Sequence, residues 1–176
     1  MRVQRAFEAL VPRCKRMGGA RVLPDLVLEK LPKGLHFAFL DPFNIEHLDF
    51  EIIRKLSARP HIDLLIHFSV MDVQRNIGGD FNQSSSRLDA AAPGWRRNLR
   101  LNEVPKHEQA GAYLEYWESL VTDLTQMQVA QSKPLFVNMN KGPLYRLIHL
   151  ARHPLATKLW NKAALPASRQ QSFPGM

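Results

Sequence analysis

Two short apolar runs constrain the fold of this chain more than any other feature of its sequence. The first, LHFAFL at 35–40, lies between Gly34 and Pro42, and the second, IDLLIHFSV, spans 62–70. Each run is nearly all apolar and too short for a buried helix, which indicates a strand covered on both faces, as in a parallel sheet.

The segment between the two runs has the pattern of a helix. Asn44 is a plausible N-cap, and apolar residues then recur every three or four positions, at Ile45, Leu48, Ile52, Ile53 and Leu56. A helical crossover of this length is what a right-handed βαβ unit requires, so we expect the two strands to be parallel neighbours.

The rest of the sequence also predicts an α/β fold. Helices are predicted over 3–17, 24–31, 110–130 and 156–164, a weak strand over 20–23, a long loop over 76–94, and a β-hairpin from 134–140 and 143–151. We therefore expect one Rossmann-like α/β domain over 1–164. Its sheet would be of the methyltransferase type, mostly parallel and closed by a C-terminal antiparallel hairpin. A disordered tail is expected over 165–176.

Composition limits the function classes. The net charge is +8 with a pI near 10.0, and the basic residues are concentrated at the two ends of the chain. Such a surface suits nucleic acid or an acidic protein as partner. No apolar stretch is long enough for a membrane helix, so we expect a cytoplasmic protein with no membrane partner. Cys14 is the only cysteine, which excludes an internal disulfide, and no metal site is predicted.

The end of the first apolar run carries the candidate chemistry. In open α/β sheets, ligands bind beyond the carboxyl ends of the strands, which places Asp41, Phe43 and Asn44 at the expected crevice, with Asn44 as a candidate substrate-binding residue. Asp41 would orient or deprotonate a substrate, and Phe43 would stack on it. The competing interpretation is that Asp41 and Asn44 cap a helix while Phe43 packs. His67, near the end of the second run, is expected to be a hydrogen-bonded core histidine rather than a ligand.

A basic cluster follows the predicted loop. Arg96, Arg97 and Arg100 lie within five residues, in a segment expected to be exposed and mobile. They are candidate substrate-binding residues that would hold phosphates.

Several blocks of the chain resemble one family in order. The blocks FAFLDPF, IDLLIHFSVMDVQRN, RLDAAAPGW and GPLYRLIHLARHPLATKLWNK together resemble the three-Cys-motif partner proteins of bacteria, over about residues 20–162. The resemblance implies a methyltransferase-like domain linked to nucleic-acid modification or phage conflict. It also implies a three-Cys-motif protein as partner, and it supports only Asp41 to Phe43 as site residues.

The chain departs from that family at its N-terminus. Family members look longer there, and the first strands and glycine-rich turn that would hold S-adenosylmethionine do not occur in this sequence. We expect the chain to be a truncated product or one half of a split enzyme, not catalytic alone, with S-adenosylmethionine binding only if the missing half is supplied. The alternative is a noncatalytic nucleic-acid-binding or protein-binding module; a nuclease is a weaker third, because Asp41 lacks a nearby second acid and lysine.

Overall fold

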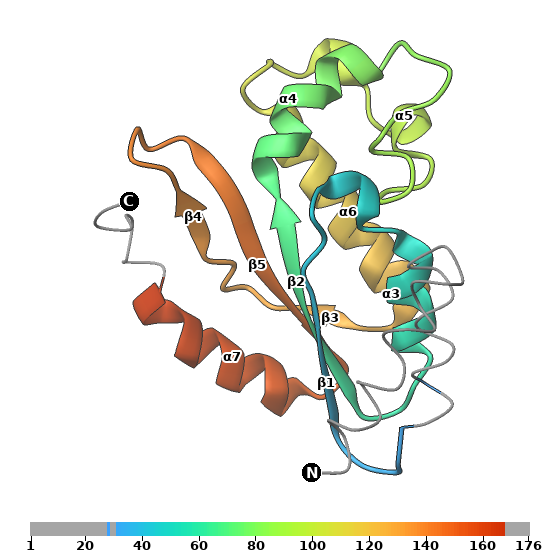
Figure 1. Cartoon of the computed structure of the whole chain (residues 1–176), viewed down its shortest axis with the longest axis vertical. Coiled ribbons are helices and arrows are strands. Elements are labelled where there is room, and N and C mark those ends of the chain that lie inside the picture. The colour runs from blue at the N-terminus through green and yellow to red at the C-terminus, as the bar shows by residue number, and fades with distance from the viewer. Residues whose placement is uncertain (1–27, 29–30, 168–176) are drawn as a thin grey trace.

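A computed structural model describes Leu28 and residues 31–167. The strands are β1 (His36–Leu40), β2 (Ile62–Ser69), β3 (Gln128–Val129), β4 (Leu135–Val137) and β5 (Pro143–Ala151). The helices are α3 (Phe50–Ser57), α4 (Val70–Asp80), α5 (Trp95–Asn98), α6 (Gln109–Thr125) and α7 (Pro154–Ala167), with 3₁₀ turns η1 (Ile45–His47) and η2 (Leu101–Glu103). The described chain is an α/β protein built on a mixed sheet (Figure 1).

The sheet combines one parallel pair with antiparallel pairs. β1 and β2 are parallel, with Ala38 opposite Leu64, as the sequence predicts. β5 runs antiparallel to β2 and also pairs with both β3 and β4, which gives the order β1-β2-β5-β3 with β4 beside β5. The expected hairpin is confirmed as the β4–β5 pair. The sheet is less parallel than expected, because β5 lies inside it rather than at its end.

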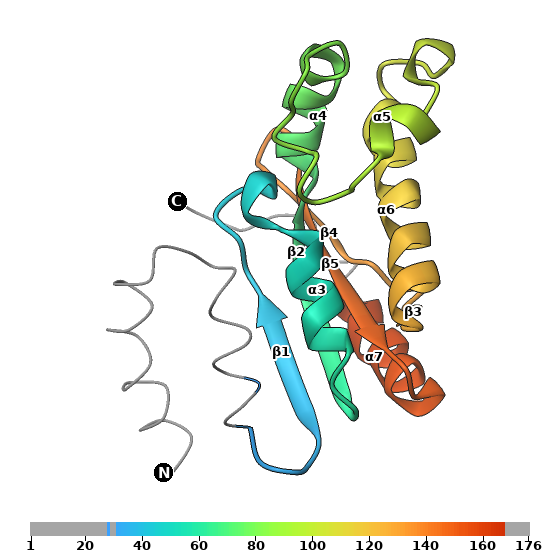
Figure 2. The ribbon, with the colours of Figure 1, turned by 90° about the vertical axis from the view of Figure 1, so that its right-hand side faces the viewer.

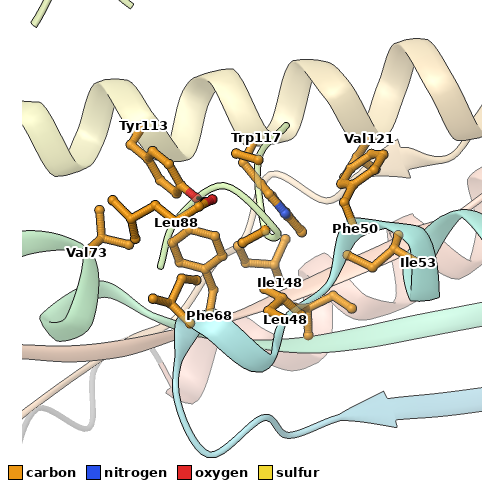
Figure 3. Packing of buried hydrophobic residues seen from close by; sticks show 14 of the residues in the cluster. Leu48, Phe50, Ile53, Phe68, Val73, Leu88, Tyr113, Trp117, Val121 and Ile148 are labelled. Atoms are coloured by element: carbon orange, nitrogen blue, oxygen red, sulfur yellow. Dashed lines mark hydrogen bonds between the residues drawn. The ribbon is translucent and has the colours of Figure 1, made fainter. Parts of the chain in front are cut away.

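Helices cover the two faces of this sheet unequally. α3, α5 and α6 lie on one side, whereas α7 crosses the lower part of the other side (Figure 1, Figure 2). The hydrophobic core lies on the first side, where Phe68 contacts Trp117 at a ring-centroid distance of 5.2 Å and Tyr113 at 6.4 Å (Figure 3). Ile66 and Ile148 are fully buried in the same layer.

The helix predicted after the first strand begins later than expected. Residues 45–47 form the 3₁₀ turn η1, and α3 starts only at Phe50. Asp49 is its N-cap, accepting a hydrogen bond from the Glu51 N–H (3.0 Å). Two cap residues five positions apart divide the apolar stripe into two short helical segments.

The predicted loop over 76–94 is partly wrong. α4 continues through Asn76 and both glycines to Asp80, because Val73 and Ile77 are spaced four apart and are both buried against the core. The loop proper begins at Phe81. It packs well, since Leu88 is fully buried and accepts a hydrogen bond from the Tyr113 hydroxyl (2.7 Å).

β1 is not covered on both faces, contrary to the sequence-based expectation. Its burial alternates, and Phe37 and Phe39 are 60% and 51% exposed. α7 extends to Ala167 and thus beyond the boundary expected at residue 164. The predicted helix over 3–17, the strand over 20–23 and Cys14 lie outside the described residues, as does the helix over 24–31 apart from Leu28 and Leu31.

Candidate functional site

The turn after β1 is held by specific hydrogen bonds. Asn44 Oδ1 accepts from the His47 N–H (3.3 Å) and lies 2.5 Å from His47 Nδ1, so Asn44 caps η1 as the capping interpretation predicts. The Ile45 N–H donates to Asp72 Oδ2 (3.1 Å), which ties this turn to the first turn of α4. Asp41 takes no part in these bonds, which leaves its carboxylate available.

Asp41 and His67 meet at the carboxyl ends of the two parallel strands. Asp41 Oδ1 lies 3.4 Å from His67 Nδ1, and the side chains are 63% and 22% exposed. Burial lowers the pKa of His67, and the charges of Asp41 and then Asp72 oppose that shift. The imidazole is therefore neutral at pH 7, beside a carboxylate that is open to solvent.

Tyr145 of β5 completes the group. Its ring centroid lies 4.2 Å from that of His67, and Tyr145 stands opposite Ser69 in the strand register. Burial and then the Asp41 charge raise the pKa of the Tyr145 hydroxyl. We call Asp41, His67, Asp72 and Tyr145 the strand-end cluster.

Sequence reasoning missed Tyr145 and underrated His67. His67 is half-buried and its Nδ1 has no hydrogen-bond partner, so it is not the satisfied core histidine that was expected. The alternation of β2 carries a signal, because His67 falls on the face opposite to that of the buried Ile66 and Phe68. For Tyr145, no local signal exists, because its position depends on the pairing of β5 with β2.

Phe43 does not pack, contrary to the capping interpretation. It is 95% exposed and lies two residues after Asp41, on the turn that leads into η1. A phenylalanine this exposed contributes little to the fold. Its suggested role in stacking on a substrate stays a prediction.

The three arginines separate into two kinds. Arg96 is structural, since it donates to Asp89 Oδ2 and to the Gln83 and Ser84 carbonyls and so fixes the loop. Arg97 and Arg100 are exposed, and Arg100 lies 3.8 Å from Glu103. In the described part of the chain, none of the three contacts Asp41 or His67. α5 packs on α6, whereas His67 projects from the face of β2 opposite to that of Ile66 and Phe68.

Other candidate sites are sparse. A shallow groove of about 660 Å³ lies between α6, β3 and α7, lined by residues such as Glu118, Gln128 and Lys158, and it shares no residue with the strand-end cluster. Within residues 31–167 and Leu28, no three His, Cys, Asp or Glu side chains gather as a metal site would require. No helix in this same part of the chain is long and apolar enough to cross a membrane.

Comparison with known proteins leaves the family undetermined. No protein-family model, no curated protein and no solved structure matches this chain. The geometry at the strand ends, with a neutral histidine between an exposed carboxylate and a tyrosine, is therefore the basis for assigning a function.

Proposed function

We propose that this chain is a methyltransferase-like domain that binds the substrate and is not catalytic alone. The sequence resemblance implies that it is a three-Cys-motif partner protein. Such a protein would act in nucleic-acid modification or phage conflict. In this role Asp41 orients or deprotonates the substrate, beside His67, and Phe43 contacts it.

The strand order carries the proposal. A parallel pair, β1 and β2, is followed by the antiparallel β5 and then by β3 and β4. The methyltransferase sheet likewise combines parallel strands with a C-terminal antiparallel hairpin, and ligands of such sheets bind at the carboxyl ends of the parallel strands. The strand-end cluster lies at those ends of β1 and β2, joined by the 3.4 Å contact between Asp41 and His67.

The exposed side of β1 supports a requirement for further strands. Four of the large hydrophobic residues that are exposed belong to this strand and its flanks, namely Leu35, Phe37, Phe39 and Phe43. Among the described residues β1 pairs only with β2. The unpaired edge of a strand is a template for pairing with another strand, and the exposed side chains on one face of β1 give such a partner an apolar surface to cover. We propose that the segment which holds S-adenosylmethionine docks here, supplied by the three-Cys-motif protein or by another partner.

The test is reconstitution of methyl transfer. The chain is co-expressed with its candidate partner, and transfer of a radiolabelled methyl group from S-adenosylmethionine to DNA or RNA is measured for the complex and for the chain alone. We expect transfer only by the complex, and Asp41→Ala should lower it about 100-fold or more, as loss of a proton-accepting group does. Transfer that is unchanged by Asp41→Ala would overturn the assigned role.

A matched pair of variants tests the docking edge. Phe37→Lys should weaken the complex about tenfold or more, because it places a charge in an apolar contact. Met139→Lys is the control, since Met139 is 78% exposed on the β4–β5 turn, away from β1. Equal affinities of the two variants would show that the partner binds elsewhere. Intact-mass measurement of the endogenous protein then shows whether its own chain supplies the further strands.

The second candidate is a noncatalytic nucleic-acid-binding module, favoured by the net charge of +8 and by the exposure of Arg97 and Arg100. In that case affinity for DNA falls steeply with salt, and Arg97→Ala and Arg100→Ala each reduce the slope of log K against log salt by about 1. Asp41→Ala would leave this binding unchanged. Salt-dependent DNA binding that does not require Asp41, together with no methyl transfer, favours the binding module over the methyltransferase.

A further inference from the structure

An aromatic row crosses three strands next to Asp41. Phe136 of β4 stacks on Tyr145 of β5 with ring centroids 4.7 Å apart and planes 14° from parallel. Tyr145 then contacts His67 of β2 at 4.2 Å, with the planes at 48°. The strand register places Phe136 opposite Tyr145 and His67 diagonal to it, so all three side chains project from one face.

This row is not part of the hydrophobic core. The core lies on the other face of β2, where Ile66 and Phe68 are at most 1% exposed. α7 covers only the lower part of the row's face, where Trp160 stacks on His149 at 5.3 Å (Figure 1). The rings of Tyr145 and His67 are half-buried but keep contact with solvent at the strand ends.

Two polar atoms of the row make no hydrogen bond with the described residues. His67 Nδ1 is buried and makes no hydrogen bond. Within the described part of the chain the Tyr145 hydroxyl has no hydrogen-bond partner either. Asp41, 3.4 Å from the imidazole, ends the row with an exposed carboxylate that only accepts hydrogen bonds. Partly exposed aromatic rings beside an exposed carboxylate are the kinds of group that line ligand sites.

From this geometry, we propose that Tyr145, His67 and Asp41 form a binding shelf for a nucleobase. The base packs against the exposed parts of the His67 and Tyr145 rings, whose planes are inclined by 48°, and an N–H of the base donates to the Asp41 carboxylate. Phe136 supports the shelf by holding the Tyr145 ring. This inference rests on the proposed function for the choice of site and names its substrate class, yet it requires neither methyl transfer nor a partner.

The base has two possible sources, a free nucleotide or a single-stranded nucleic acid. The full-length chain is titrated with AMP, CMP, a short single-stranded DNA and the same DNA lacking bases, by calorimetry at fixed salt. Upfield shifts of the base protons, measured by NMR, report stacking on the rings. If the mononucleotides bind about as tightly as the DNA, the ligand is a free nucleotide. If the base-bearing DNA binds much more tightly, the ligand is a single-stranded nucleic acid.

Variants assign the binding to the shelf. Tyr145→Leu should weaken binding of the base-bearing ligand about fivefold or more, the range found when a stacking partner is lost. Asp41→Ala should also weaken it about fivefold or more, because a hydrogen bond to a charged acceptor is lost. Tyr145→Phe keeps the ring and should retain most of the affinity, which separates loss of stacking from loss of folding. Tyr116→Leu, on α6 at the other side of the sheet, is the matched control and should bind as the unaltered chain does.

Two results would overturn the shelf. They are equal affinity for DNA with and without bases, and unchanged affinity of the folded Tyr145→Leu variant. Failure of the shelf and failure of the proposed function are distinguishable. If the chain binds bases but the reconstituted complex transfers no methyl group, the proposed methyltransferase function is refuted and the shelf is not. If binding does not depend on the bases, the shelf is refuted, whether or not the complex transfers methyl groups.

Discussion

Similar hydrogen bonds in this fold should differ in how much they stabilise it, depending on their burial. Tyr113 and Tyr116 lie on the same helix, and each donates a hydrogen bond to a loop carbonyl, at 2.7 Å to Leu88 and 2.8 Å to Pro93. The first bond is buried and the second is exposed to water. Their chemistry is identical, so the pair isolates the effect of burial on the strength of a hydrogen bond.

We predict that Tyr113→Phe destabilises the protein by about 1–3 kcal/mol, because it leaves the Leu88 carbonyl buried without a partner. Tyr116→Phe should cost less than about 1 kcal/mol, since water replaces the lost donor. Urea unfolding of both variants measures the difference. Equal losses would mean that the buried carbonyl finds another donor.

The candidate site shows how far residue-level reasoning reaches. The position of Asp41 was predictable, because it directly follows an apolar run that predicts a strand ending at the edge of the sheet where ligands bind. Asn44 was predictable as a cap from its residue type alone. The pairing of Asp41 with His67 required the parallel register of β1 and β2, which the sequence indicated without fixing it.

At the scale of elements, one arginine joins three segments. Arg152, directly after β5, donates to the Ser57 carbonyl at the end of α3, to the Thr125 carbonyl at the end of α6 (3.1 Å) and to the Arg59 carbonyl (3.2 Å). Two of these carbonyls belong to helix C-termini, which carry a partial negative charge that favours a cation. Arg152 therefore stabilises the end of the molecule opposite the candidate site.

We predict that Arg152→Ala lowers the free energy of unfolding by about 1.5–3 kcal/mol, the range for hydrogen bonds to charged groups. Arg152→Lys should recover only part of this loss, because an ammonium group cannot reproduce the planar set of guanidinium donors. Arg54→Ala removes an exposed pair with Glu51 and is the matched control, with an expected loss below about 1 kcal/mol. The measurement is urea unfolding at constant salt, and a loss for Arg152→Ala no larger than the control's would contradict the prediction.

Elements also show where pattern reading failed. The two glycines of α4 suggested a loop, but Val73 and Ile77 are buried against the core, and their burial outweighs the low helix propensity of glycine. The helix expected after Asn44 was divided because Asp49 offers a second cap. Burial against the core outweighs local preferences such as helix propensity. A sequence pattern does not show which residues will be buried in this way.

For the whole molecule, the two faces of the sheet have different character. One is a dry core, and the other carries two histidines next to acids, His67 near Asp41 and His149 with Asp63 at 4.0 Å. Burial lowers the pKa of both histidines, and the neighbouring carboxylates, with Asp72 also acting on His67, only partly oppose that shift. The folded state therefore binds fewer protons than the unfolded state just below pH 6.5.

Stability should accordingly decrease as the pH falls below about 6.5, where histidines of the unfolded chain take up protons before those of the folded chain. Urea unfolding at pH 7.5 and 5.5 tests this, with His149→Gln expected to reduce the pH dependence. A stability that is constant or higher at pH 5.5 would contradict the prediction, because the sign follows directly from the lowered pKa values.

The sequence by itself determined the elements whose signals are local. These are the two parallel strands with their crossover, the long helix around Trp117 and the β4–β5 hairpin, in which apolar period and turn residues act over a few positions. Only the tertiary structure decided that β5 lies between β2 and the short strands, that Tyr145 meets His67, and that Phe37 and Phe39 stay exposed. The physical reason is that strand order and register depend on burial between segments far apart in the chain, and one strand's own pattern fits several neighbours equally well.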